Sequence, residues 1–293
     1  MPTPEWLADR FEEHRAHLRS VAYRMLGSAS EAEDAVQEAW IRLGRTDVRD
    51  VESLRAWLTT VVSRVCLDIL RSRTSRREAP LDVYVPDPVI TRLAPDPESD
   101  AMAADAVGLA LLVVLETLKP AERLAFVLHD VFGMTFDEIA PIVDRTPVAA
   151  RQLASRARRR IHGKAPKSDP NLHEQRRVLE AFLAAAQEGD FERLITVLDP
   201  EIVLRADGGA LGAASRVVRG ARAVAAQAAS FSKLGLSSQL VLVNGNVGVI
   251  TRRPDGPLFS VLGFTIAGGK IVEIDILADP VRLDRLDLSS VQD

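Results

Sequence analysis

The 293-residue sequence is poor in the residues that build disulfide frameworks and metal centres. Cys66 is the only cysteine, which excludes an internal disulfide and any multi-cysteine metal site. The five histidines are scattered, without an HxH or HxxxH pair, so we expect no zinc site. Nothing in the sequence indicates a metal or a cofactor.

Long apolar runs are also missing. No stretch approaches the roughly 18 apolar residues that a membrane span needs. The N-terminal MPTPEWLADRFEEH does not have the pattern of a signal peptide. Because 47% of the residues are hydrophobic and 27% are charged, the composition is that of a globular protein, and we expect it in the cytoplasm without membrane contact. The length is sufficient for two or three domains.

The N-terminal part has helical periodicity. Apolar residues recur three or four apart over 5–26 and 53–72, and over a further stretch between them. Ser30 and Glu33 have the spacing of a capping box, which predicts the start of this middle helix. Its outer face is polar and carries Asp34, Gln37 and Glu38.

Two tryptophans lie on apolar stripes of these helices. Trp40 belongs to the middle helix and Trp57 to the helix over 53–72. We expect both to pack in the core rather than to serve as stacking platforms for bases.

Residues 78–102 differ in composition from both flanking segments. They contain five prolines and six acidic residues but only one basic residue. This composition predicts an extended, semi-rigid acidic linker. Helical patterning returns over 103–118, breaks at Lys119-Pro120 and resumes over 121–131.

A strongly basic segment follows in this mildly acidic chain. Residues 144–164 carry seven arginines or lysines and one aspartate, whereas the whole chain has a formal net charge of −4. Thr135 and Glu138 predict a capped short helix, in which Pro141 should cause a kink. Thr146 and Pro147 predict the start of a second helix. Two short helices joined by a turn are typical of the helix-turn-helix motif.

The second of these helices has an apolar and a polar side. Ala149, Leu153, Ala157 and Ile161 lie four apart and are expected to pack inward. Arginine can bind guanine and glutamine can bind adenine in the major groove, while further arginines contact phosphates. An ordinary solvated basic helix is the alternative. The expected DNA-contacting residues are Arg151, Gln152, Ser155, Arg158 and Arg159.

Together, these segments resemble a known family. AYRMLGSASEAEDAVQEAWIRL and LRAWLTTVVSRVCLDILRSR resemble region 2 of bacterial sigma-70 factors, and LKPAERLAFVLHDVFGMTFDEIAPIVDRTPVAARQLASRARRRI resembles region 4. With no region 3 between them, the chain is similar to the extracytoplasmic-function group. The resemblance implies binding to core RNA polymerase, through the β′ coiled coil and the β flap, and to promoter DNA.

The resemblance also implies roles for region-2 residues. The polar face formed by Asp34, Gln37 and Glu38 would dock on the β′ coiled coil. The loop 44–53 and the helix that follows it would recognise and open the −10 element. The −10-binding residues implied are Arg64, Asp68, Arg71 and Arg73.

The chain continues beyond region 4 with a different pattern. Two helical stretches, a strand-like EIVLRADGGA, a helix near 219–233 and alternating apolar runs with hairpin signals predict an α+β cone over 171–293. This order resembles the SnoaL-like fold of the SigJ-like subfamily. The expected organisation is therefore multidomain, with two all-α domains, 5–77 and 103–165, a linker over 78–102 and the SnoaL-like cone.

Three motifs of that subfamily have counterparts here, each altered at one or more positions. The W-L-P-E-P, D-G-G-G and N-P-D-K-L motifs correspond to Tyr84-Val85-Pro86-Asp87-Pro88, Asp207-Gly208-Gly209-Ala210 and Asp279-Pro280-Val281-Arg282-Leu283. The resemblance implies that the extension is a built-in regulator acting in cis.

Other interpretations of the C-terminal cone remain open. Arg205, Asp207, Asp275 and Asp279 are polar groups that acid/base chemistry could use, although His173 is the only histidine of this domain. The cone could instead bind a small molecule as an input signal. A third alternative is a one-component helix-turn-helix regulator that senses a ligand and never joins the polymerase.

Overall fold

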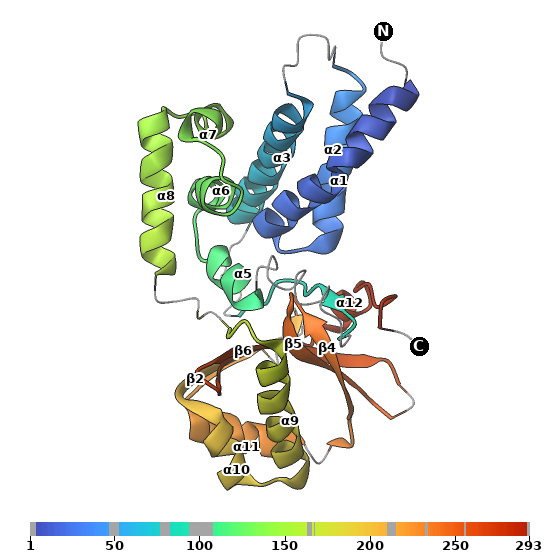
Figure 1. Cartoon of the computed structure of the whole chain (residues 1–293), viewed down its shortest axis with the longest axis vertical. Coiled ribbons are helices and arrows are strands. Elements are labelled where there is room, and N and C mark those ends of the chain that lie inside the picture. The colour runs from blue at the N-terminus through green and yellow to red at the C-terminus, as the bar shows by residue number, and fades with distance from the viewer. Residues whose placement is uncertain are drawn as a thin grey trace. The chain divides into compact units, whose positions relative to one another are not determined.

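The computed structural model describes residues 4–46, 53–76, 83–93, 108–162, 166, 168–209, 215–231, 234–254 and 256–291. The chain divides into two compact units, coloured along the sequence in Figure 1. Unit 1 comprises Met1–Pro80 and Val114–Lys164, and unit 2 comprises Leu81–Val113 and Ala165–Asp293. Each unit is therefore built from two separate stretches of chain.

The N-terminal part of unit 1 contains three packed helices. α1 (Pro4–Leu26) contacts both α2 (Ala29–Leu43) and α3 (Leu54–Arg76), as the apolar periodicity predicts. Gly27 ends α1 with a φ of +68°, a conformation that glycine adopts without steric cost. Within the described part of the chain, no helix has the length and apolarity needed to cross a membrane.

Two local expectations for these helices are wrong. α2 begins at Ala29 after Ser28, whose side chain forms no capping hydrogen bond. The predicted box fails because the helix begins before Ser30, so Ser30 is not the N-cap, and the Glu33 carboxylate pairs with Arg15 of α1. Trp40 is 37% exposed and contacts Phe11 at a ring-centroid distance of 5.1 Å, so it is not a core residue. Its position at the edge of the apolar stripe accounts for this exposure.

The second stretch of unit 1 is a chain of short helices. α5 (Leu109–Glu116) crosses the boundary between the units, α6 (Pro120–Phe126) follows, and a π-helical turn over Val127–Val131 ends this segment. α7 (Phe136–Val143) and α8 (Pro147–Ile161) complete the unit. α6 packs against α8, and α3 contacts α6 and α7. The N-terminal bundle and the helix-turn-helix therefore share one packed unit.

Both helices of the helix-turn-helix start at the predicted caps, but the buried residues of the second helix differ from those predicted. Thr135 and Glu138 form the capping box, and the Thr146 hydroxyl accepts from the Ala149 amide at 3.2 Å. Pro141 lies inside α7, which is only eight residues long. The inward stripe of α8 is fully buried at Ala150, Ala154 and Ala157. The predicted spacing of four throughout is wrong because it drifts about 40° per step around a helix of 3.6 residues per turn.

Unit 2 is built on a seven-stranded sheet of order β1-β4-β5-β6-β7-β2-β3. β2 and β7 are parallel, and all other neighbours are antiparallel. The strands are Ile90–Thr91 (β1), Leu198–Asp207 (β2), Arg216–Arg219 (β3), Ser237–Val243 (β4), Asn246–Arg252 (β5), Leu258–Ala267 (β6) and Lys270–Leu277 (β7).

Three helices cover one face of this sheet (Figure 1). They are α9 (Leu172–Glu188), α10 (Phe191–Val197) and α11 (Ala221–Phe231). Their apolar side chains pack with alternate residues of the strands into one cluster, which includes the T-shaped ring pair of Phe182 and Phe264. α12 (Pro280–Leu283) follows β7. The architecture is the α+β cone expected from the sequence.

Part of the expected linker belongs to this sheet. Ile90 and Thr91 form edge strand β1 on β4, and the Asn244 amide donates to the Val89 carbonyl at 2.8 Å. Val83 and Val85 are buried. The segment is extended, as the prolines predict, but residues 83–93 are packed rather than free because valines and isoleucine lie between the prolines.

Candidate functional sites

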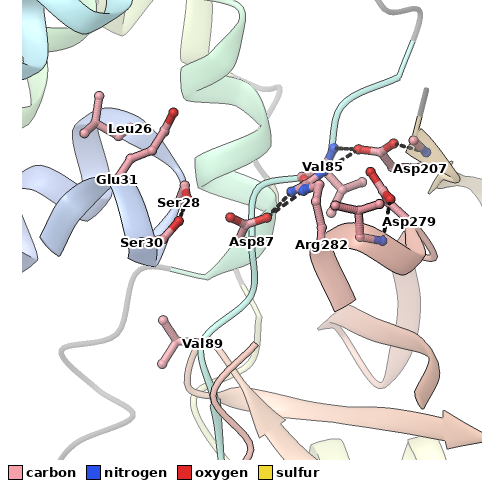
Figure 2. A network of polar contacts seen from close by, with 12 residues as sticks. Leu26, Ser28, Ser30, Glu31, Val85, Asp87, Val89, Asp207, Asp279 and Arg282 are labelled. Atoms are coloured by element: carbon pink, nitrogen blue, oxygen red, sulfur yellow. Dashed lines mark hydrogen bonds and ion pairs between the residues drawn. The ribbon is translucent and has the colours of Figure 1, made fainter. Parts of the chain in front are cut away.

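Three segments far apart in the sequence meet in unit 2, as Figure 2 shows. The Arg282 guanidinium donates to the Asp87 carboxylate at 2.7 Å, the Asp207 carboxylate at 2.8 Å and the Val85 carbonyl at 2.5 Å. It also lies over the Tyr84 ring, 4.7 Å from the centroid. We call this group, Tyr84, Val85, Asp87, Asp207 and Arg282, the clasp. It joins the linker to the sheet and to α12.

Asp207 and Asp279 also accept hydrogen bonds from backbone amides. Asp207 accepts from the Val85 amide and from the Gly209 amide, both at 3.0 Å. Asp279 caps α12 by accepting from the Val281 amide at 3.0 Å. The Gly208 amide donates to the Ser215 hydroxyl at 3.1 Å. Residues 207–209 therefore form a turn in which the Asp207 carboxylate contacts the linker.

The other residues of the three motifs surround the clasp. Pro86 and Pro88 are buried in unit 2, and Leu283 anchors α12 in the core, whereas Pro280 is exposed at the first position of that helix. Ala210 lies outside the described residues. The structure thus brings together the predicted regulatory residues, although their mutual contacts could not be read from the sequence.

The electrostatics of the clasp are those of a buried charge cluster. The side chains of Arg282, Asp87 and Asp207 are only 18%, 17% and 6% exposed. Burial lowers the pKa of Arg282, but Tyr84, Asp87 and Asp207 outweigh this effect and raise the pKa above its ordinary value. Two carboxylates from different segments therefore share one cation.

Substitution of Gly209 should test the close packing at this turn. Gly209 has a φ of +75°, and a Cβ added there would overlap the Asp279 carboxylate. We expect Gly209→Ala to lower the free energy of unfolding of unit 2 by about 2 kcal/mol, from backbone strain and overpacking together. Gly268→Ala is the matched control, because Gly268 has a φ of +59° with nothing within 4 Å of the added Cβ. Equal losses in urea denaturation would contradict the packing role of Asp279.

A second charged cluster lies on β2 and β7. Arg205 pairs with Glu273 and, at 3.1 Å, with Asp275, and both carboxylates are buried. Burial raises the pKa of Asp275 to about 6, and the attraction of Arg205 offsets this only in part. The Asp275 carboxyl group therefore holds its proton more tightly in the folded protein than in the unfolded chain.

This cluster predicts a pH-dependent stability difference. Because the folded-state pKa of Asp275 lies above its ordinary value of 3.8, its contribution to stability is present at low pH and is lost as the pH rises through about 6. The melting temperature of Asp275→Asn minus that of the wild type should therefore grow between pH 4 and pH 7. Asp284→Asn, at an exposed position, should show no such trend. A pH-independent difference for Asp275→Asn would contradict the shift.

These polar residues do not form a site inside the cone. Arg205 is paired in register with Asp275, and its neighbours Leu204 and Ala206 pack in the helix-covered cluster. Because side chains alternate along a strand, Arg205, Asp207 and Asp275 lie on the opposite face. His173 is exposed at the start of α9. The helix-covered interior is filled by apolar side chains.

The predicted docking face of α2 is accessible. Asp34 and Gln37 are exposed, and Glu38 is half-buried and forms an ion pair with Arg42 at 2.9 Å. The buried side of α2 carries Ala32, Ala35, Val36, Ala39 and Leu43. This amphipathic division is the one that the sequence predicts.

The predicted −10-binding residues of α3 are in different environments. The Arg64 guanidinium donates to the Pro141 carbonyl of α7 at 2.9 Å, while Arg71 faces Asp68 at 3.7 Å, with both side chains exposed. Arg73, which is also predicted to bind the −10 element, forms contacts within unit 1. It donates to the Leu26 carbonyl at 3.1 Å and pairs with Glu31, so it joins α3 to the α1–α2 junction. Of the predicted loop 44–53, residues 47–52 lie outside the described residues.

The outer face of α8 contains the predicted reader residues. Arg151, Gln152, Arg158 and Arg159 are exposed, and Ser155 is half-buried. Arg158 forms an ion pair with Asp130 at 2.6 Å. The remaining arginines of α8, Arg156 and Arg160, bind the buried Glu122 and so hold α8 on α6. The basic segment therefore combines exposed and structural arginines.

Sequence reasoning missed a ring stack that supports Arg151. The Arg151 guanidinium lies 5.3 Å from the centroid of the Phe136 ring, which stacks on His129 with 4.0 Å between centroids. His129 belongs to the π-helical turn, and its Nδ1 lies 2.8 Å from the Met134 carbonyl oxygen. A π-helical turn has no simple sequence signature, so the periodicity over 121–131 predicts an ordinary helix.

Comparison with known proteins agrees with this architecture. The chain matches the family model of sigma-70 region 2 over residues 10–76 and that of sigma-70 region 4 over residues 108–161. The ECF RNA polymerase sigma factor SigJ of Mycobacterium tuberculosis is 39% identical over 288 residues, which cover 92% of this chain and 91% of SigJ. The chain therefore belongs to the extracytoplasmic-function sigma factors of the sigma-70 family.

The similarity extends through the C-terminal domain. The crystal structure of SigJ from the same organism covers 96% of this chain and 99% of that chain, with a TM-score of 0.73 and 33% identity. Probable ECF sigma factor SigI of Mycobacterium tuberculosis is 36% identical over 281 residues, covering 93% of each chain. This chain is therefore a SigJ-like sigma factor, and the match includes its C-terminal α+β domain.

Proposed function

We propose that this chain directs core RNA polymerase to promoters and that its C-terminal domain regulates this activity in cis through the clasp. The observation that carries the regulatory part is the position of Arg282, which binds Asp87 and Val85 of the linker together with Asp207 of the sheet. The linker connects the two regions that must bind DNA. A domain that holds this linker restrains both of them.

The recognition surfaces belong to unit 1. The exposed positions of Asp34 and Gln37 support docking of α2 on the β′ coiled coil. For −10 recognition the candidates on α3 are Arg64, Asp68 and Arg71, whereas the contacts of Arg73 favour a structural role. For −35 recognition, we assign base contacts to Arg151 and Gln152 and phosphate contacts to Arg159.

Catalysis by the cone is not supported by the arrangement of its ionisable groups. Arg205, Asp207 and Asp275 engage one another or the linker, on the face opposite the apolar interior. The same apolar filling gives no support to a small-molecule ligand in the cone. We therefore propose a regulator that acts through protein contacts rather than through turnover or ligand capture.

Run-off transcription with core polymerase tests this function directly. The template is the promoter region upstream of the protein's own gene, with either its matched −35 element or a scrambled one. We expect Arg151→Ala to lose about 1–3 kcal/mol on the matched element and to relax specificity, because base contacts discriminate between sequences. Arg159→Ala should weaken both templates alike, as loss of a phosphate contact does.

Two outcomes would contradict the proposal. Failure of the full chain to co-purify with core polymerase would contradict the proposed action as a polymerase-bound initiation factor and would favour the one-component regulator. Equal losses of Arg151→Ala on matched and scrambled templates would remove the base-reading role from Arg151.

A further inference from the structure

One exposed residue of α8 has no role in the functions assigned so far. Val148 is 68% exposed, the largest value among the large hydrophobic side chains in the described part of the chain. It occupies the second position of α8, directly after Pro147. A single exposed valine is unremarkable in itself, but this one lies at the DNA-reading end of the helix.

The position of Val148 on the helix is that of a reader residue. Arg151, Gln152 and Ser155 follow it by three, four and seven residues, so the four side chains form one stripe along α8. The buried stripe of Ala150, Ala154 and Ala157 lies on the opposite side. In a helix-turn-helix, the N-terminal residues of the second helix contact base edges in the major groove.

The first turn of α8 also holds Val148 rigidly. The Thr146 hydroxyl accepts from the Ala149 amide at 3.2 Å, and the Ala150 amide donates to the Thr146 carbonyl at 2.9 Å. Proline at the first helical position has a fixed φ angle that suits a helix. A β-branched side chain in a helix has one strongly preferred χ1 rotamer. The two methyl groups of Val148 are therefore oriented before any DNA binds.

The chemistry of the major groove identifies a partner for this apolar group. Thymine is the only base that presents a methyl group there, and the other groups on the base edges are hydrogen-bond donors or acceptors. A valine cannot satisfy those groups, whereas it can bury the thymine methyl. We propose that Val148 is a specificity-determining residue that contacts the 5-methyl group of a thymine in the −35 element. This inference rests on the proposed reading of the −35 element by α8.

The test removes the methyl group from either partner. Full-length protein in complex with core polymerase first selects its preferred −35 element from a duplex library randomised at that position. Each thymine of the selected element is then replaced by uracil, which lacks only the methyl group. We expect one replacement to weaken binding of the wild-type complex about fourfold, which corresponds to the burial of one methyl group.

The decisive comparison is with Val148→Ala. This variant should bind the thymine and uracil duplexes equally at that position, with an affinity near that of the wild type for uracil. It should fold normally, because the side chain is exposed and alanine is the better helix former. Val217→Ala, at an exposed valine on β3, is the matched control and should retain the fourfold difference.

The outcomes separate this inference from the proposed function. A thymine–uracil difference that persists in Val148→Ala, no difference at any thymine, or a selected element without thymine would each overturn the inference. In all three cases, loss of sequence preference by Arg151→Ala would leave −35 reading by α8 intact. Unchanged preference in Arg151→Ala would instead contradict the proposed function itself.

Discussion

Arg123→Ala is expected to lower the free energy of unfolding of unit 1 by about 3–5 kcal/mol. Arg123 lies in α6 and is fully buried, with 2% of its side chain exposed. Its guanidinium donates to the Glu116 carboxylate at 2.6 Å and to the Arg24 carbonyl at 3.3 Å. Removing the arginine leaves a largely buried carboxylate without its cation and removes the donor to the Arg24 carbonyl.

The tryptophans make this loss measurable in the intact protein. Trp6, Trp40 and Trp57 are the only tryptophans, and all belong to unit 1. Tryptophan fluorescence during urea denaturation therefore follows unit 1 alone. Arg159→Ala, at an exposed position, should leave the midpoint unchanged.

A double variant shows how much of the stability lost in Arg123→Ala comes from leaving the Glu116 carboxylate without its cation. Arg123→Met combined with Glu116→Leu removes both charges and should recover most of the lost stability, because replacing a whole buried pair by apolar residues is often neutral. If Arg123→Ala leaves the fluorescence midpoint unchanged, the buried pair does not stabilise unit 1.

Arg282→Met should have a comparable effect on unit 2, of about 3 kcal/mol. The substitution keeps much of the side-chain volume but leaves the Asp87 and Asp207 carboxylates without their shared cation. Loss of the far-ultraviolet signal of the sheet should occur at lower urea, while tryptophan fluorescence should report an unchanged unit 1. Arg282→Lys should recover only part of the stability, because an ammonium group cannot reproduce the planar fork that binds three acceptors at once.

The same variant tests regulation through the clasp. Run-off transcription with Arg282→Met should differ several-fold from the wild type, because the linker is released from the sheet. More transcript would mean that the clasp inhibits the factor, and less would mean that it supports the promoter-bound arrangement. Arg285→Ala, at an exposed arginine three residues further on, is the control. Identical transcript levels for Arg282→Met and wild type would overturn cis regulation through the clasp.

Local signals in the sequence predicted local structure well. The capping box of Thr135 and Glu138 and the Thr146 cap are correct because both partners belong to the same helix end. The similar spacing of Ser30 and Glu33 does not form a box because α2 begins before Ser30, and the Glu33 carboxylate pairs with Arg15 of another helix. The spacing of two residues does not show where a helix starts or which residues of other helices lie beside it.

Long-range contacts were beyond prediction from one sequence. All three clasp motifs could be recognised, but Arg282 and Asp87 are separated by 195 residues, and no periodicity relates them. The packing of residues 83–93 was missed for the same reason, since the pairing partner of Ile90 is Val243 in a distant strand. Arg123 could have been suspected as a charged residue at an inward position of α6, but its role depends on Glu116 and Arg24.

The separation of 195 residues between Asp87 and Arg282 also sets an order of events on the ribosome. Bacterial chains grow at about 5–20 residues per second, so the linker is made about 10–40 s before the arginine that binds it. Every newly synthesised molecule therefore passes through an interval in which both DNA-reading regions exist and the clasp does not. An incomplete chain that ends before α12 lacks Arg282 and would never form the clasp.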